Sequence, residues 1–253
     1  MVWAVASALL LAVPKPSARP APAFVVVVDP GHGGEKEGAV SAEGAREKDL
    51  TLQIARRVKA RLERQGVRVI LTRDADGTVA LPQRAALANA KKADLFVSIH
   101  LNAMPGASHL RARGVETYFL SADATDASAS AVAARENADR LAGEPELDRT
   151  DAVAGILADL EDAANLSESS RLAYALHEGV VRGAAAEDRG VKQAPFSVLA
   201  GARMPAALVE LGFLSHPQEG RMLRGAHYQE ALARGIADGI AAWRAQGRRA
   251  ALR

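Results

Sequence analysis

Apolar residues along this chain follow two different periods, which alternate from one segment to the next. The run Phe24–Val28 is continuously apolar and mostly β-branched, which is typical of a strand buried on both faces of a sheet. The segment 47–65 instead has an apolar residue at every fourth position, which predicts a helix with one buried stripe that ends before Gly66. The stripe consists of Leu50, Ile54, Val58 and Leu62.

The alternation continues to the end of the chain. Strands are predicted over 67–72, 95–99 and 206–211, and a more exposed strand over 114–120. Helices are predicted over 81–90, 228–244 and most of an Ala-rich stretch at about 122–183, which is broken near 143–145. Strand, helix, strand, helix, strand is the order of an α/β fold. We therefore predict a single domain with a mostly parallel sheet and helices on both of its faces.

The first residues differ from the rest. The apolar run Trp3–Val13 is too short to span a bilayer, and the Pro-rich stretch 14–23 ends in Ala21–Ala23, which fits a signal-peptidase site. We predict that 1–23 is an export signal and linker, that 24–253 is the globular domain, and that the mature chain is periplasmic or secreted without a transmembrane segment. No Lys or Arg precedes the apolar run, so an apolar tag or core segment is the alternative.

Charge and composition narrow the kind of function. The formal net charge is +2 and aromatic residues make up 4% of the chain, so a nucleic-acid-binding surface has little support. The chain has no cysteine. Any zinc site must therefore use histidine and carboxylate ligands, which suits a catalytic site better than a structural one.

Three chemically active side chains follow predicted strands. His32 lies in a glycine-rich turn after the first strand, His100 directly follows 95–99, and Glu210 lies near the end of 206–211. Ligands of open α/β sheets bind beyond the carboxyl ends of the strands, so we expect the three to share one edge. Glu47, at the start of the 47–65 helix, is the fourth candidate.

Most of these residues also have an ordinary structural explanation. His32 is explained as a turn histidine, and Glu47 is favoured at a helix start by roughly 0.3–1 kcal/mol. His100 is explained as a polar group satisfied at a strand end. Glu210 is harder to explain in this way, because it lies within an apolar run and an unpaired buried carboxylate is very costly.

One zinc ion accounts for all four positions. His32, Glu47 and His100 form a three-ligand set that leaves a place for water, and Glu210 then serves as general base. Asp29 is a candidate for orienting His32 from behind, although bonding within its own turn explains it equally well. His216 is interpreted as a loop histidine, and the remaining histidines as surface residues: His109, His177 and His227.

Several segments in one order resemble the zinc-dependent N-acetylmuramoyl-L-alanine amidases of bacterial cell-wall turnover. The resemblance covers nearly all of 24–245. It rests on VVVVDPGHGG, REKDLTLQIARRVKARLE, VILTRDAD, LPQRAALANAKKADLFVSIHLNA, RGVETYFLS, RGVKQAPFSVL and MPAALVELGFLSHPQE. It implies a twisted sheet flanked by helices and zinc on His32, Glu47 and His100. Glu210 is the implied catalytic residue. The implied reaction is hydrolysis, in peptidoglycan, of the amide between the lactyl group of N-acetylmuramic acid and L-alanine.

The segment 130–162 resembles the regulatory insertion of the periplasmic, cell-division members of that family. In those proteins a helix covers the zinc site, a glutamate takes the open position, and an activator of the LytM type removes it. The resemblance implies that Glu136 is this plug. An ordinary solvated helix is the alternative, since Glu136 is flanked by Arg135, Asp139 and Arg140.

Two other functions remain open from the sequence. One is a different zinc hydrolase of stem peptides, such as a carboxypeptidase. The other is a peptidoglycan-binding module without catalysis. The presence of a glutamate at the base position, Glu210, argues against this second alternative.

An amidase of the family described above would act in cell-wall remodelling or in the separation of daughter cells.

Overall fold

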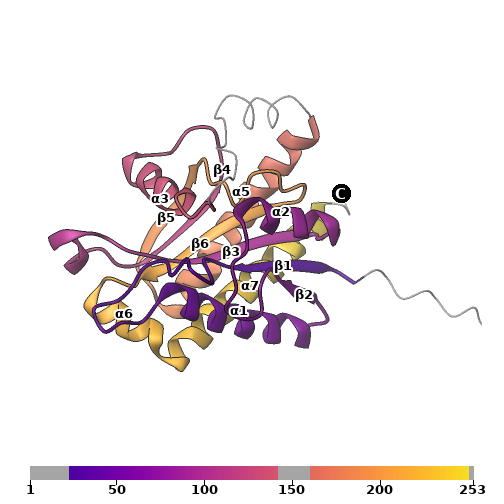
Figure 1. The fold of residues 1–253 in the computed structure, drawn as a ribbon. Helices are drawn as coiled ribbons and strands as arrows, with labels where there is room; N and C mark the ends of the chain where they lie inside the picture. Colours follow the sequence, from indigo (N-terminus) through magenta and orange to yellow (C-terminus); the bar gives the residue numbers. More distant parts are fainter. Residues whose placement is uncertain (1–22, 142–159, 251–253) are drawn as a thin grey trace, which may run out of the picture.

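The computed structural model of the protein describes residues 23–141 and 160–250 (Figure 1). Its strands form one sheet in the order β2-β1-β3-β6-β4-β5. The strands are β1 (Val25–Pro30), β2 (Arg68–Leu71), β3 (Leu95–Asn102), β4 (Val115–Leu120), β5 (Asp188–Ala194) and β6 (Ala206–Phe213). The helices are α1 (Glu47–Arg64), α2 (Leu81–Ala90), α3 (Ala127–Asn137), α5 (Leu160–Ala184), α6 (Pro217–Arg224) and α7 (Ala226–Ala250), with a 3-10 turn over Gly106–Leu110.

The sheet is mostly parallel, as predicted. β2, β1, β3 and β6 run in one direction, whereas β4 is antiparallel to β6 and parallel to β5. The carboxyl ends of β1, β3 and β6 therefore meet at one edge. The register places His100 of β3 directly opposite Glu210 of β6, so two candidate residues far apart in sequence are neighbours in space.

Helices cover both faces of the sheet, which confirms the predicted architecture. Successive side chains of a strand point to opposite faces, and β1 feeds two separate cores in this way. Val26 and Val28 pack in the core under α1, α5 and α7, while Val25 and Val27 pack in the core under α2 and α3. No helix of the described residues is long and apolar enough to cross a membrane.

β4 is buried along nearly its whole length, so its predicted exposure is wrong. The reason is that β4 lies between β6 and β5 and is packed against α5. The edge strand β5 was not predicted, because an edge strand with one neighbour needs few apolar residues and DRGVKQA has few. Neither was α6, although His216 as N-cap and Pro217 at its first position are helix-start signals.

His177 is a second correction. It was expected at the surface, but it lies buried on α5, with Nδ1 3.1 Å from the Thr117 hydroxyl and Nε2 2.8 Å from Asp188. His227 is exposed, as expected. Residues 1–22 and the predicted helix break near 143–145 lie outside the described residues.

Candidate metal centre

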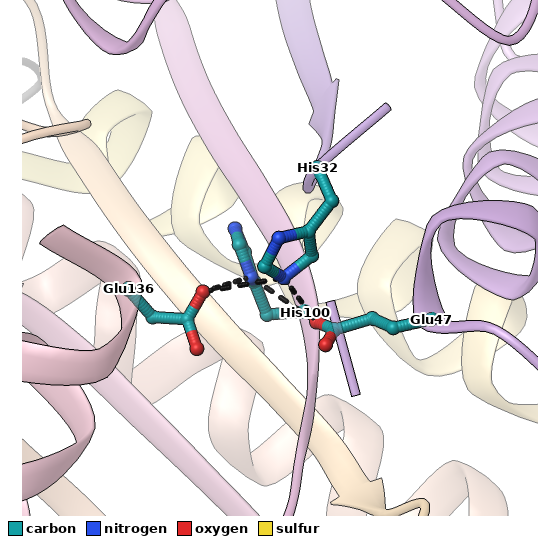
Figure 2. Close-up of side chains that lie close together, drawn as sticks. All are labelled: His32, Glu47, His100 and Glu136. Atoms are coloured by element: carbon teal, nitrogen blue, oxygen red, sulfur yellow. Dashed lines mark ion pairs between the residues drawn. The ribbon is translucent and has the colours of Figure 1, made fainter. Parts of the chain in front are cut away.

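Four buried side chains converge at the carboxyl edge of the sheet (Figure 2). Glu47 Oε1 lies 3.0 Å from His32 Nε2 and 3.2 Å from His100 Nδ1. Glu136 Oε2 lies 3.3 Å and 2.8 Å from the same two nitrogens. His32 Nε2, His100 Nδ1 and Glu136 Oε2 have no hydrogen bond of good geometry within the described structure although all three are buried. Such a convergence of lone pairs can hold a metal ion.

The turn after β1 holds His32 in an unusual backbone conformation. Its φ is 59°, in the left-handed region that residues other than glycine seldom adopt. Two buried arginines stabilise it, because the His32 carbonyl accepts a hydrogen bond from Arg73 Nε at 2.9 Å and another from Arg84 Nη2 at 3.0 Å. Arg73 also binds the Gly31 carbonyl at 2.7 Å. Surrounding structure of this kind is what keeps a strained residue in place at a functional site.

Gly31 is required by close packing rather than by its backbone angles. A Cβ atom at this position would lie 2.4 Å from His100 Cε1 and 2.5 Å from His100 Nε2. The absence of a side chain therefore lets the turn after β1 pass directly over the His100 ring. In this way the glycine beside His32 determines where the second histidine can lie.

Glu47 is the first residue of α1, and it is buried rather than solvated at the helix start. Its Oε2 accepts a hydrogen bond from the Ala39 amide at 2.8 Å, and its Oε1 accepts one from the Leu101 amide at 2.8 Å. Two backbone donors from separate segments thus fix the carboxylate beside both imidazoles. The helix-start explanation is correct for the backbone of Glu47, but it does not account for the orientation of the side chain.

The electrostatics of the cluster are those of mutually stabilised charges. Burial alone would raise the pKa of Glu47, but the neighbouring imidazoles of His32 and His100 lower it to about 2. Burial would lower the pKa of His100, but Glu136 and Glu47 raise it to about 10. In the absence of an ion, protons on the histidines therefore balance the carboxylates, which is the electrostatic task that a bound cation performs.

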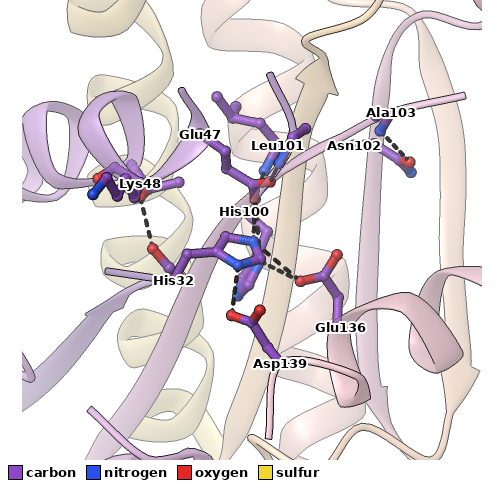
Figure 3. A network of polar contacts seen from close by, with 12 residues as sticks. His32, Glu47, Lys48, His100, Leu101, Asn102, Ala103, Glu136 and Asp139 are labelled. Carbon is purple, nitrogen blue, oxygen red and sulfur yellow. Dashed lines mark hydrogen bonds and ion pairs between the residues drawn. The ribbon is translucent and has the colours of Figure 1, made fainter. Parts of the chain in front are cut away.

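Glu136 reaches the cluster from the last turn of α3 and is only 3% exposed, so it does not lie on a solvated helix face. Asp139, just beyond α3, places Oδ2 2.7 Å from His32 Nδ1 (Figure 3). Asn137 adds a hydrogen bond from its side chain to the Pro195 carbonyl at 2.8 Å. With α3 in this position the cavity beside His32 and His100 measures about 10 Å³, which holds at most one water molecule.

Glu210 lies next to the cluster on β6 and is completely buried. Burial raises its pKa to about 8, and the negative charge of Glu136 adds to this effect. Its Oε1 is 3.3 Å from Arg135 Nη2, whereas its Oε2 has no hydrogen-bond partner in the described structure. A buried carboxylate with a free oxygen and a pKa near neutrality has the properties of a general base.

Asp29 makes no hydrogen bond to the His32 ring within the described residues. Its carboxylate instead accepts hydrogen bonds from Arg84 at 2.9 Å, Ser98 at 2.8 Å and the Thr72 hydroxyl. The partner of the His32 ring at Nδ1 is Asp139. Asp29 acts one step further away, because it holds Arg84, which binds the His32 carbonyl.

Sequence reasoning thus placed His32, Glu47, His100 and Glu210 at one site but overlooked residues that support it. Arg73 and Arg84 lie inside two of the segments that carry the family resemblance, so their presence in those segments was an available signal. Asp139 and Arg135 carry no local signal, because a charged residue on a polar helix resembles a solvated one. The overlooked residues are Arg73, Arg84, Arg135 and Asp139.

Comparisons with known proteins give a consistent result. The sequence profile of the family described as N-acetylmuramoyl-L-alanine amidase matches residues 26–242. The chain is 36% identical to AmiC of Neisseria meningitidis serogroup B over 218 residues, which cover 85% of this chain and 51% of the relative. It is 34% identical to AmiA of Escherichia coli K12, covering 85% of this chain and 74% of the relative. The chain therefore spans about half the length of the first of these relatives.

Solved structures agree with the sequence comparison. The N-acetylmuramoyl-L-alanine amidase from Clostridium difficile 630 superposes with a TM-score of 0.67 at 31% identity, over 87% of this chain and 96% of that one. The amidase AmiC2 of Nostoc punctiforme superposes with a TM-score of 0.64 at 30% identity, over 87% and 96%. With its profile match over almost the whole domain, this chain belongs to the N-acetylmuramoyl-L-alanine amidase family.

Proposed function

We propose that this protein is a zinc-dependent amidase that hydrolyses the bond between the lactyl group of N-acetylmuramic acid and L-alanine in peptidoglycan. The observation that carries the proposal is the convergence of His32, Glu47 and His100 with their ligand atoms facing one point. Membership of the amidase family supports the choice of substrate.

The residues fit a single zinc ion. A tetrahedral ion with bonds of about 2.0–2.1 Å has ligand atoms roughly 3.3 Å apart, and the contacts between the two imidazole nitrogens and the carboxylate oxygens measure 2.8–3.3 Å. Two histidines and a carboxylate are a donor set that zinc uses in hydrolytic enzymes. When bound, zinc lowers the pKa of water and polarises a carbonyl.

The protein's own groups would then complete the reaction. His32, Glu47 and His100 hold the site, and their positions are fixed by Arg73, Gly31 and the backbone amides that bind Glu47. Glu210 takes the proton from the attacking water and later delivers it to the leaving amine of L-alanine. Its burial favours this exchange, because burial raises the pKa of the Glu210 carboxyl group from its ordinary acidic value towards neutral pH.

Glu136 and α3 act as a plug in this proposal. Glu136 offers a fourth ligand atom at the place that water or substrate would need, and Arg135 pairs with Glu210 at the same time. The cavity of about 10 Å³ beside the histidines excludes a peptide. We infer that the structure represents a closed state and that an activator protein, of the LytM type found for related periplasmic amidases, displaces α3. Export by the N-terminal segment 1–23 and a role in cell division belong to the same proposal.

Product analysis with controlled metal content tests the function. Dye-labelled sacculi are digested with the purified protein, with the protein after chelation, and with the chelated protein after zinc is restored. We expect dye release to stop on chelation and to return with zinc, and mass spectrometry to find peptides with a free N-terminal L-alanine. Release of a terminal D-amino acid would identify a carboxypeptidase, and zinc binding without any release would identify a binding module.

A further inference from the structure

Arg135 lies beside the metal centre, and its guanidinium group fills a position built by other segments. Its Nη1 donates hydrogen bonds to Asn102 Oδ1 and to the Ala103 carbonyl, both at 3.0 Å. Its Nη2 lies 3.3 Å from Glu210 Oε1, while its Nε binds Glu136 within α3 itself. The first three acceptors belong to β3, the residue after it and β6, so they stay at the sheet edge when α3 is displaced. Arg135 therefore marks a place that binds a cation with several N–H groups.

The orientation of the Asn102 side chain is fixed by two hydrogen bonds. Its Nδ2 donates to Glu116 Oε2 at 2.9 Å, and its Oδ1 accepts the Ala103 amide at 2.8 Å (Figure 3). An ionised carboxylate only accepts hydrogen bonds, so the amide group of Asn102 cannot turn round without losing both. Asn102 is also completely enclosed, with 1% exposure. Its carbonyl oxygen is therefore held toward the Arg135 guanidinium.

Glu116 is a second buried carboxylate close to Glu210. The two residues lie directly opposite each other in the antiparallel pair of β4 and β6, so their side chains point to the same face of the sheet. Arg189 Nε and Lys192 Nζ, both from β5, donate hydrogen bonds to Glu116 Oε1 at 3.1 Å. The edge strand thus supplies the positive charge that a completely buried carboxylate needs, and Glu116 Oε2 holds Asn102.

Arg135 does not use every acceptor at this place, and the place reaches solvent. The Oε2 atom of Glu210 is buried and has no hydrogen-bond partner in residues 23–141 or 160–250. The Arg135 side chain is 36% exposed, and Met104, the residue after Ala103, is 37% exposed. A ligand that replaces the guanidinium can therefore enter and leave directly from solvent.

The proposed reaction generates a cation of this kind next to Glu210. Water adds its oxygen to the lactyl carbonyl carbon, the C–N bond breaks, and Glu210 delivers to the nitrogen the proton that it took from water. The nitrogen, which already carried one hydrogen atom, leaves as an amine, and the new carboxylic acid gives it a further proton. The products are a carboxylate and a peptide whose N-terminal L-alanine carries an ammonium group. Glu210 is again a carboxylate at this point, and so an acceptor.

We propose that the three acceptors of the Arg135 guanidinium at the sheet edge form a subsite for the amino group of the leaving L-alanine, and that Arg135 occupies it in the closed state as a mimic of the product. An ammonium group has three N–H donors, one for each acceptor. Glu116 is a positioning residue, because it acts through Asn102. The peptide product therefore competes with Arg135 and inhibits the open enzyme. The inference rests on the proposed amidase function.

Two small probes, added to the full zinc-loaded chain, test the subsite. L-Alanine N-methylamide carries the ammonium group of the product's first residue, and N-methylpropionamide lacks only that group. Neither contains an amide between a lactyl group and L-alanine, so neither is cleaved by the proposed reaction. The methyl NMR signal of Met104, next to Ala103, reports binding, and buried Met204 is the internal reference.

Arg135→Ala empties the subsite and should separate the two probes. In this variant we expect L-alanine N-methylamide to shift Met104 in a saturable way and to bind about tenfold or more tightly than N-methylpropionamide, because hydrogen bonds from a charged donor are the stronger ones. In the unchanged chain its Kd should be about tenfold or more higher, because Arg135 competes for the same acceptors. The matched control is Arg182→Ala at a 67% exposed position of α5, whose Kd should equal that of the unchanged chain.

Two further substitutions, each added to Arg135→Ala, locate the acceptors. Asn102→Leu removes the carbonyl acceptor at nearly constant shape, and Glu116→Gln lets the Asn102 amide turn round, because a glutamine side chain can donate as well as accept. Each should lower the preference for L-alanine N-methylamide by about threefold or more. A purely structural role would change the stability of the fold but not the ratio of the two Kd values. Glu178→Gln, at a 77% exposed position, should keep the full preference.

The proposal is overturned if the two probes bind Arg135→Ala with equal Kd, if the unchanged chain binds L-alanine N-methylamide as tightly as Arg135→Ala does, or if Asn102→Leu leaves the ratio of the Kd values unchanged. An unchanged ratio in Glu116→Gln refutes the positioning role of Glu116, and where Asn102→Leu does not fold, Glu116→Gln decides the proposal.

These measurements need no turnover, so they are separate from the test of the amidase function. Preferential binding of the ammonium probe by a protein that releases no L-alanine peptides from sacculi would refute the amidase proposal and leave the subsite standing. Release of such peptides together with equal binding of the two probes would refute the subsite and leave the amidase proposal standing.

Discussion

The Nδ1 atom of His100 lies 2.8 Å from Oε2 of Glu136, although His100 belongs to the central strand β3 and Glu136 to the helix α3. The neighbouring Arg135 reaches Glu210 at 3.3 Å. Two consecutive residues of α3 thus contact the proposed metal ligands and the proposed base. Because α3 contacts both the proposed metal ligands and Glu210, its displacement would expose the metal site and the base together.

Glu136→Ala should raise the basal hydrolysis of sacculi by about tenfold or more. The reason is that the ion pairs of Glu136 with His32 and His100 stabilise the closed state, and losing about 1.4 kcal/mol of that stabilisation changes the population tenfold. The measurement is dye release by zinc-loaded protein without an activator. Glu178→Ala, at a 77% exposed position of α5, is the control and should not change the rate. An unchanged rate in Glu136→Ala at full zinc content would show that Glu136 is no plug.

Glu210→Gln should lower kcat by about 10²–10⁴-fold, the usual contribution of a general base, and should keep one zinc per chain. The amide has nearly the shape of the carboxylate but cannot accept the proton of water. Zinc content by mass spectrometry and kcat on labelled sacculi are measured on the same preparation. Turnover close to that of the unchanged chain would remove Glu210 from the mechanism, whereas loss of zinc would make it a ligand.

Gly31→Ala should weaken zinc binding by about 10–100-fold, the range expected when a group that orients a ligand is altered. The added methyl group would lie 2.4 Å from the His100 ring and push it away from Glu47. The control is Gly77→Ala, where a Cβ meets nothing within 4 Å. Competition with a chromophoric chelator gives both affinities. Equal affinities for the two variants would mean that the ring can move without cost.

Arg84→Met should lower the free energy of unfolding by about 3–5 kcal/mol at pH 7, because it leaves the buried carboxylate of Asp29 without its cation. Burial alone would raise the pKa of Asp29, but Arg84 and the hydroxyls of Thr72 and Ser98 hold it below its ordinary value of 3.8. The stability that this pair provides is present above pH 3.8 and is lost as the pH falls through the lower pKa of the folded state.

The pH dependence separates this effect from lost packing. In Arg84→Met the deficit should shrink as the pH falls through 3.8 and below, because protonated Asp29 no longer needs a buried counter-charge, and it should be smallest below the lowered folded-state pKa of the unchanged chain. Urea unfolding at pH 7 and pH 3 measures it, with Arg182→Met at a 67% exposed position as control. A deficit of equal size at both pH values would assign the loss to packing instead.

Much of the fold was predictable because its cause is local. The apolar run before His32 and the four-residue stripe of α1 specify a buried strand and a helix that packs on it, and the structure has both within two residues. The exposure of β4 was misjudged for the opposite reason. Its alternating sequence is typical of a half-exposed strand, but its place between β6 and β5, with α5 packed against it, is a tertiary property.

The site divides in the same way. The sequence determined which residues carry the chemistry, because imidazoles and carboxylates that directly follow buried strands must arrive at the edge where parallel strands end. Only the tertiary structure decided how they are held. Position 31 has no room for a side chain larger than a hydrogen atom, because the His100 ring lies against it. Asp29 binds Arg84 rather than the His32 ring. The sequence also did not decide whether Glu136 faces solvent or the metal-ligand cluster. A charged side chain on a polar helix becomes buried only through contacts with distant segments, and the packing of α3 beside His100 provides these contacts.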